Sequence, residues 1–358
     1  MLFDPFTAPG LDLRNRVVMS PMTRNRAVVS STPNALMAEY YAQRAGAGLI
    51  VTEGTSPSPN GLGYARIPGL FNASQATSWK VVTDAVHARG GRIVVQLMHT
   101  GRISNAANMP AGARIIGPVA LAAAGEIHTD TGGMQAHDVP SAMTATDIQS
   151  TVAEYAHAAG LAIEAGFDGI ELHAANGYLI EQFLNANVNT RGDAWGGSIE
   201  GRNRFALEVV RACVAAVGAS RVGIRLSPHG AFNSTGTFPD VDAQYEALTR
   251  ELSALHLGYL HLLDHSAMGA PAVPAALKAR LRTLFQGPFI LAGGFDAKTA
   301  ESALLAAQAD LIAFGRPFIA NPDLVERMKL GAPLSQPDFS TFYTPEARGY
   351  TDYPALAG

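Results

Sequence analysis

The segment Gly169–Leu184, GIELHAANGYLIEQFL, decides how the rest of the chain is interpreted. It begins with an apolar run typical of a buried strand, and this run ends at His173. Asn176 and Gly177 then predict a turn, after which the apolar residues recur with a helical pattern. Because parallel α/β proteins bind ligands at the carboxyl ends of their strands, His173, Asn176 and Tyr178 are the first candidates for catalysis.

Similar apolar runs recur along the chain and alternate with segments of helical periodicity. The predicted strands cover residues 16–20, 48–53, 92–97, 167–173, 222–226, 259–263, 289–292 and 311–314. The predicted helices cover residues 35–45, 75–89, 145–165, 202–217, 243–255, 297–306 and 324–330, with Asp240 and Asp296 as N-caps. Repeated strand–helix units predict a parallel sheet, and eight strands predict an α/β fold of the (β/α)8 TIM-barrel type, formed by residues 1–358 as a single domain.

Two segments lie outside this repeat. Residues 100–144, after the third strand, are rich in Ala, Gly and Pro and show no clear helix. Long loops of this kind are often functional, so we expect this capping segment to lie over the barrel mouth. Residues 331–358 form an aromatic tail that either folds over the same mouth or packs on the outside of the barrel.

Composition narrows the class of protein. The chain is 47% hydrophobic and 16% charged, which is typical of a compact enzyme. A net charge of -4 and the lack of a Lys/Arg cluster argue against nucleic acid or an anionic membrane as partner. The single cysteine, Cys213, cannot form an intrachain disulfide. With no signal peptide or membrane-spanning stretch recognised, we expect a cytoplasmic monomer or homodimer.

Glycines follow the last two predicted strands. Gly293 and Gly294 follow the seventh strand, and Gly315 and Arg316 follow the eighth. In many barrels these two loops bind phosphate, because glycine lets backbone N–H groups approach the anion closely. Arg316 would add a charge-assisted contact. The simpler alternative is that these glycines only end their strands.

Two polar residues lie inside apolar strands. Arg225 requires an anion or an acceptor-rich partner when buried, and a reduced flavin or a salt bridge to Glu171 or Glu53 would each satisfy it. Gln96 can donate and accept, which matches the edge of a pyrimidine-like ring, although it could also be a core glutamine. His173 and Asn176 could together stabilise a developing oxyanion while a nearby phenol delivers a proton.

Together these motifs resemble the old yellow enzyme family of flavin-dependent ene-reductases over nearly the whole chain. The family-like stretches are residues 13–24 (LRNRVVMSPMTR), 95–102 (VQLMHTGR), 171–178 (ELHAANGY), 314–324 (FGRPFIANPDL) and 349–354 (GYTDYP). The resemblance implies tightly but non-covalently bound FMN and NAD(P)H as reductant. It also implies hydride transfer from flavin N5 to the β-carbon of an activated alkene: an α,β-unsaturated carbonyl, a maleimide or a nitroalkene.

The resemblance also implies roles for individual residues. Pro21, Met22 and Thr23 would line the flavin, with Thr23 in place of the cysteine of another branch. Gly54 and Gln96 would hold the pyrimidine side, Arg225 would lie beside N1/O2, and Gly293, Gly294, Gly315 and Arg316 would bind the phosphate. His173 and Asn176 would bind the substrate oxygen, and Tyr178 would protonate the α-carbon. Tyr64, Met98 and Tyr343 would line the substrate pocket.

Several alternatives remain beside this interpretation. Reduction of nitrate esters or nitroaromatic compounds would use the same parts. A metal-dependent hydrolase would need the cluster His261, Asp264 and His265, and a non-catalytic flavin store would leave Tyr178 unexplained. A Schiff-base aldolase is excluded because every lysine falls in or beside a predicted helix. No G-x-G-x-x-G motif follows a strand, so we expect the nicotinamide to use the substrate pocket, which predicts ping-pong kinetics.

Overall fold

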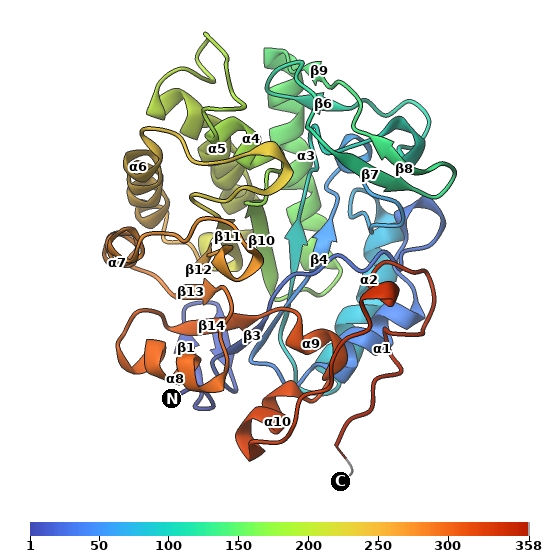
Figure 1. Cartoon of the computed structure of the whole chain (residues 1–358). Coiled ribbons are helices and arrows are strands. Elements are labelled where there is room, and N and C mark those ends of the chain that lie inside the picture. The colour runs from blue at the N-terminus through green and yellow to red at the C-terminus, as the bar shows by residue number, and fades with distance from the viewer. Residues whose placement is uncertain (357–358) are drawn as a thin grey trace.

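The computed structural model describes residues 1–356, and its centre is a closed barrel of parallel strands (Figure 1). Around the barrel the strands are β3 (Val17–Met19), β4 (Leu49–Thr55), β5 (Ile93–Leu97), β10 (Gly169–Ala174), β11 (Val222–Leu226), β12 (Tyr259–Leu263), β13 (Phe289–Ala292) and β14 (Leu311–Phe314). β14 pairs with β3 and closes the barrel. Each strand overlaps its predicted position, so the prediction of a TIM barrel is confirmed.

Helices surround this barrel. They are α1 (Ala35–Gln43), α2 (Ala73–His87), α3 (Ala145–Glu164), α4 (Leu179–Leu184), α5 (Ile199–Val217), α6 (Val241–Ala254), α7 (Ala275–Leu284), α8 (Ala297–Leu305), α9 (Pro317–Ala320) and α10 (Leu324–Leu330). The predicted helices all form. The sequence missed α7, in which only Leu277 and Leu281 are buried and no side chain caps the amino end, so its helical signals are weak.

The two predicted N-caps differ in outcome. Asp296 accepts a hydrogen bond from the Thr299 backbone N–H and completes a capping box, as predicted. The prediction for Asp240 was wrong, because its side chain makes no capping hydrogen bond. Its carboxylate instead accepts from Arg202 Nη2 at 2.6 Å, an interaction between two segments that sequence periodicity does not reveal.

A hairpin that the sequence did not predict covers the amino end of the barrel. It consists of β1 (Phe6–Ala8) and β2 (Leu11–Leu13), which pair antiparallel. Leu11 and Leu13 pack with the apolar residues of the barrel interior, among them Val18, Val51 and Ile290. The hairpin therefore fills that end, and the carboxyl ends of the strands form the mouth.

The capping segment contains no α-helix in the structure, as expected, but it does contain short strands. β6 (Ile116–Gly117) pairs with β9 (Ser141–Ala142), and between them β7 (Glu126–Thr129) and β8 (Gly133–Ala136) form a hairpin. Figure 1 shows these strands at the upper right, on the opposite side of the molecule from the N-terminus.

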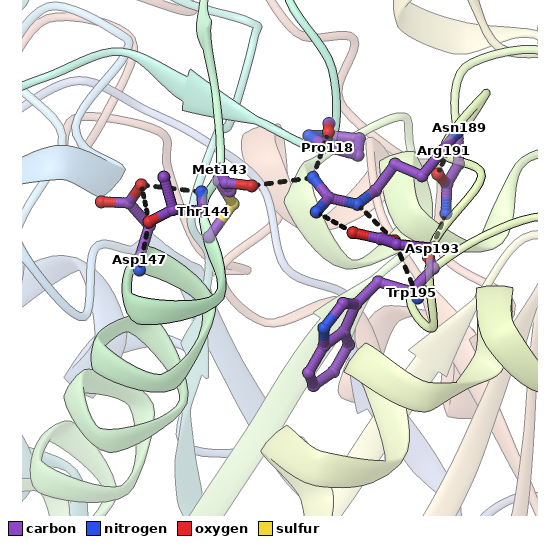
Figure 2. Close-up of polar contacts among 8 residues, drawn as sticks. All are labelled: Pro118, Met143, Thr144, Asp147, Asn189, Arg191, Asp193 and Trp195. Atoms are coloured by element: carbon purple, nitrogen blue, oxygen red, sulfur yellow. Dashed lines mark hydrogen bonds and ion pairs between the residues drawn. The ribbon is translucent and has the colours of Figure 1, made fainter.

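One arginine fastens the base of this hairpin to the loop that follows α4. Figure 2 shows Arg191 Nη1 donating to the carbonyl oxygens of Pro118, at 2.7 Å, and Met143, at 2.8 Å. These residues lie directly after β6 and β9, where the chain leaves for the hairpin and returns. Asp193 pairs with the same guanidinium and holds it in place.

One part of the aromatic tail lies at the barrel mouth, and another part packs on the outside of the barrel. Phe339, Phe342 and Tyr343 line the cavity at the barrel mouth. Further along, Tyr350 is buried on the outside of the barrel and stacks on Tyr40 of α1, with ring centroids 4.0 Å apart.

Two further features bear on the predictions from composition. Within the described residues, no helix has the length and hydropathy needed to cross a membrane. Cys213 is a free thiol buried against other apolar residues of α3, α5 and their surroundings, and burial raises its pKa to about 12.

Candidate active site

A cavity of about 620 Å³ opens at the carboxyl ends of the strands. Ten of the residues predicted for the site line it: Pro21, Met22, Thr23, Asn176, Arg225, Gly293, Gly294, Gly315, Arg316 and Tyr343. The other six lie outside this lining: Gly54, Tyr64, Gln96, Met98, His173 and Tyr178. Except for the half-buried Tyr64, those six are buried. The structure therefore places the predicted residues at one end of the barrel, some on the cavity surface and some in its supporting layer.

The side of the cavity at β13 and β14 is built from backbone. Gly293 and Gly294 have φ angles of 138° and 72°, which side chains disfavour. A Cβ added at Gly293 would lie 2.5 Å from the Asp264 carbonyl oxygen. At Gly315 the nearest atoms to such a Cβ would be 3.8 Å away, which leaves open space above the backbone. Arg316 is exposed and makes one long contact, 3.5 Å, to Ala267.

Arg225 extends from β11 and lines the wall of the cavity. It is 5% exposed, and its Nε has no hydrogen-bond partner within residues 1–356. The predicted alternative, a salt bridge to Glu171 or Glu53, does not form in this part of the chain: Glu171 pairs with His261, and Glu53 accepts from Tyr41 and from the Arg24 backbone. A buried, unpartnered guanidinium fits a bound ligand that presents an acceptor, such as the edge of a flavin ring.

Gln96 is held by a buried carboxylate. Its Nε2 donates to Glu171 Oε1 at 2.8 Å, and Glu171 Oε2 lies 2.8 Å from His261 Nδ1. Burial would raise the pKa of Glu171, but attraction to His261 and Arg225 outweighs it and lowers that pKa. The carboxylate therefore stays ionised and compensates the charge of Arg225. This role of Glu171 was not predicted from the sequence, although Glu171 and His173 share one face of β10 by strand alternation.

His173 is arranged as a neutral donor. Its Nδ1 accepts from the Ala175 backbone N–H at 3.3 Å, from which we infer that the proton lies on Nε2. Burial and the nearby Arg225 lower the pKa of His173 well below its ordinary value. The imidazole is therefore uncharged at neutral pH and can donate from Nε2.

Asn176 is fixed on three sides. It adopts a left-handed conformation with φ 59°, and its backbone N–H donates to Ser227 Oγ at 3.0 Å. His265 Nε2 lies 2.9 Å from Asn176 Oδ1 and donates to it. The amide NH2 of Asn176 is thereby left to face the cavity. The sequence placed His265 only in a possible metal cluster and missed this contact.

Tyr178 lies beside these two donors. Its ring packs edge-on against His173, with centroids 4.8 Å apart, and its hydroxyl lies 3.1 Å from that of Tyr64. Burial, with a further contribution from Tyr64, raises the pKa of Tyr178 well above its usual range, so the phenol stays protonated. Asn233 donates to the Asn176 carbonyl at 2.7 Å and partly offsets the raised pKa values of both phenols. No periodic pattern marks Asn233, because it lies in a turn with φ 53°.

The capping segment forms an apolar roof over this corner. Ile103, Ala123 and Ile127 cluster with Tyr178 and Met98. A Cβ on Gly54 would collide with the Met98 side chain, so this glycine makes room for Met98. Residues of the capping segment thus pack against Tyr178, and their apolar side chains shield it from water.

The three residues of the possible metal cluster have separate partners. His261 pairs with Glu171, Asp264 with Lys278 at 2.6 Å, and His265 with Asn176. Among residues 1–356 no three His, Cys, Asp or Glu side chains converge as metal ligands. The geometry thus gives no support to the hydrolase alternative.

Comparison with known proteins assigns the family. Residues 1–335 match the model of the NADH:flavin oxidoreductase / NADH oxidase family. Chanoclavine-I aldehyde reductase of Penicillium roqueforti (strain FM164) is 44% identical over 363 residues, which cover 98% of this chain and 95% of that protein.

Two solved structures are similar over almost the full chain. Morphinone reductase in complex with tetrahydroNAD has a TM-score of 0.94 and 43% identity, covering 99% of this chain and 98% of that one. The old yellow enzyme homologue from Zymomonas mobilis has a TM-score of 0.95 and 38% identity, covering 99% of both. The resemblance to the old yellow enzymes is thereby confirmed, and the chain belongs to the NADH:flavin oxidoreductase / NADH oxidase family, as an FMN-dependent enzyme with a nicotinamide reductant.

Proposed function

We propose that this enzyme reduces activated alkenes, with Tyr178 as proton donor and His173 and Asn176 as the oxygen-binding pair. When bound, FMN accepts hydride from NAD(P)H and delivers it to the β-carbon of the alkene. The observation that carries the proposal is the contact of Tyr178, a buried and protonated phenol, with His173, next to Asn176.

The chain would hold the cofactor from two sides. Arg225 offers its unpartnered guanidinium to the acceptor edge of the ring, while Pro21, Met22 and Thr23 line the cavity beside it. Gln96 and Gly54 would support the pyrimidine side. Gly293, Gly294 and Gly315 would approach the phosphate with their backbone, and Arg316 would contribute charge.

His173 and Asn176 would bind the carbonyl or nitro oxygen of the substrate. His173 Nε2–H and the Asn176 amide are both free to donate, because Nδ1 of the former and Oδ1 of the latter are already occupied. Neutral donors of fixed orientation stabilise the negative charge that develops on this oxygen as the β-carbon is reduced.

Tyr178 would then protonate the α-carbon. Its hydroxyl is hydrogen-bonded to Tyr64, so the proton that leaves can be replaced through the second phenol. Tyr64, Met98 and Tyr343 would form the walls around the substrate. Since no G-x-G-x-x-G motif follows a strand, we expect the nicotinamide and the alkene to occupy the same pocket in turn, with ping-pong kinetics.

A direct experiment separates the two half-reactions. Purified protein is reduced anaerobically with NADPH, and 2-cyclohexenone, N-ethylmaleimide or a nitrate ester is then added to separate samples. Rapid reoxidation by the first two supports alkene reduction. Flavin that bleaches but is reoxidised by none of these compounds would contradict the proposal.

The double variant His173→Ala/Asn176→Ala tests the binding pair. We expect bound FMN to be retained and enone-dependent reoxidation to fall by roughly 10²- to 10³-fold, as when oxyanion donors are removed elsewhere. Unchanged reoxidation would remove both residues from the proposed role.

A second candidate function is the reduction of nitrate esters or nitroaromatic compounds. The two donors His173 and Asn176 also suit the two oxygens of a nitro group. Faster reoxidation by the nitrate ester than by either alkene would favour this function. We further propose that the protein acts in the cytoplasm as a monomer or homodimer, which fractionation and light scattering would test.

A further inference from the structure

Arg66 joins three segments at the rim of the cavity. It lies two residues after Tyr64, and its side chain is 21% exposed. Its Nη1 pairs with Asp130 in the turn of the β7–β8 hairpin, its Nη2 donates to the Tyr343 carbonyl at 2.8 Å, and its Nε donates to the Asn25 carbonyl at 3.1 Å. We call this set of contacts the Arg66 bridge.

The backbone at Arg66 is in a conformation that favours glycine. Its φ is 54°, in the left-handed region, which a residue with a Cβ adopts less readily than glycine. Nevertheless, Nε, Nη1 and Nη2 of Arg66 each donate a hydrogen bond to an acceptor. The side-chain contacts thus offset a local backbone cost.

One end of the bridge is rigid. The tail around Tyr343 is anchored by Arg26, which donates to the carbonyl oxygens of Thr341, at 2.8 Å, and Phe342, at 2.7 Å. Arg24 donates to the Gly349 carbonyl at 2.7 Å. Both arginines are 1% exposed. The Tyr343 carbonyl therefore keeps its place whether or not Arg66 is present.

The other end of the bridge is the tip of a projecting hairpin. Arg191 holds the base of the hairpin at Pro118 and Met143 (Figure 2). Nearer the tip, Asn108 donates to the carbonyl oxygens of His128 and Gly63, each at 2.9 Å. Between base and tip, Ile127 packs into the roof over Tyr178. Movement of the tip would therefore loosen the roof.

We propose that Arg66 is a positioning residue for the substrate pocket, which fastens the tip of the β7–β8 hairpin to the anchored tail and so holds the roof closed over Tyr64 and Tyr178. This inference rests on the proposed function, because it assigns the pocket under the roof to the alkene. Arg66 is not itself among the residues that line the cavity, and its contact with that lining is to the backbone carbonyl of Tyr343.

Loss of the Arg66 bridge should weaken substrate binding and leave the rate of the chemical step unchanged. If the roof is closed for a smaller fraction of the time, the apparent dissociation constant of the alkene rises by the inverse of that fraction. The closed complex itself is unchanged, so the limiting rate of reoxidation stays the same.

Two variants at the bridge and one matched control test this. Arg66→Gly removes the side chain and relieves the backbone, so a folding defect is not expected. Asp130→Asn removes only the ion pair. The control is Arg114→Ala, which breaks another Arg–Asp pair, the 2.8 Å contact between Arg114 of the capping segment and Asp147 of α3, away from the hairpin tip.

Stopped-flow reoxidation of the reduced enzyme by increasing 2-cyclohexenone measures affinity and limiting rate separately. We expect the apparent dissociation constant to rise about tenfold in Arg66→Gly and about threefold in Asp130→Asn, the range of partly exposed ion pairs and charged hydrogen bonds. The limiting rate should stay within about twofold, and the Arg114→Ala control should match the wild type.

Hydrogen–deuterium exchange of peptides covering residues 126–136 provides a readout that does not depend on activity. Exchange should be faster in both bridge variants and unchanged in the control. Wild-type exchange rates in Arg66→Gly, or an unchanged dissociation constant, would overturn the proposal. If the wild type fails to reduce 2-cyclohexenone, the proposed function fails, while the exchange comparison still decides whether Arg66 holds the hairpin.

Discussion

The two sides of the cavity are built in different ways. At β13 and β14 the wall is backbone: Gly293 and Gly294 have positive φ angles and no room for a side chain, Gly315 borders open space, and one exposed arginine lies nearby. At β5, β10 and β11 the wall is a set of interlocked side chains, in which nearly every polar atom of Gln96 and Glu171 has a partner. A bulkier residue on the first side should therefore weaken FMN binding. On the second side, the loss of a single functional group should be enough to slow alkene reduction.

The largest effect should follow removal of one hydroxyl from the side-chain wall. Tyr178→Phe keeps the buried ring against His173 but loses the proton donor, so alkene-dependent reoxidation should fall roughly 10²- to 10⁴-fold. Bleaching of the flavin by NADPH should be nearly unchanged. The matched control is Tyr343→Phe. Tyr343 lines the cavity, but it is 58% exposed. A small, equal loss in both variants would show that Tyr178 is not the proton donor.

Added bulk tests the backbone wall. In Gly315→Val the new side chain would occupy the open space beside Ser20 and Met22, and we expect the FMN dissociation constant to rise roughly 10- to 100-fold. Fluorescence titration of the apoprotein measures it. Gly46→Val, at an exposed glycine with nothing within 4 Å of its Cβ, should bind FMN normally. Tight binding by Gly315→Val would place the phosphate elsewhere.

A smaller effect on substrate affinity is expected at His265, which contacts Asn176 rather than the substrate. His265→Leu removes the donor to Asn176 Oδ1, so the amide can rotate and present its oxygen to the cavity. The apparent dissociation constant of 2-cyclohexenone should rise about fivefold, the cost of one mispositioned hydrogen bond. Replacement by Gln, which can still donate, should restore much of the affinity. Equal loss in both variants would point to packing against Phe232 instead.

The smallest effect expected is that of pH. Tyr178 must be protonated, and its raised pKa means that this form is lost only above pH 10. His173 must be neutral, and its lowered pKa means that this form is lost only well below pH 6.5. Reoxidation by 2-cyclohexenone under saturating conditions should therefore be constant between about pH 6.5 and 9. A bell-shaped profile within that window would assign the proton transfer to another group.

The barrel and the residues at its strand ends could be predicted because their signals are local. Apolar runs such as residues 289–292 mark a strand by composition, and the residue that follows a strand must lie at the mouth of a parallel barrel. His173, Asn176 and Gly315 were found in this way. The same reasoning wrongly predicted a capping hydrogen bond for Asp240. Its carboxylate instead accepts a hydrogen bond from Arg202 of another helix, which the local sequence does not reveal.

The sequence by itself determined the barrel, the position of the site and, through a family resemblance, the cofactor, because strand alternation and strand-end residues follow from the order of residues along the chain. Only the tertiary structure decided which side chains hold the site in place: Glu171 under Gln96, His265 on Asn176, Asn233 beside the phenols, and Arg66 between hairpin and tail. Each of these contacts joins segments far apart in sequence, and several start from turns of left-handed backbone. The partner of a polar group depends on distance in space, which periodicity along the chain does not specify.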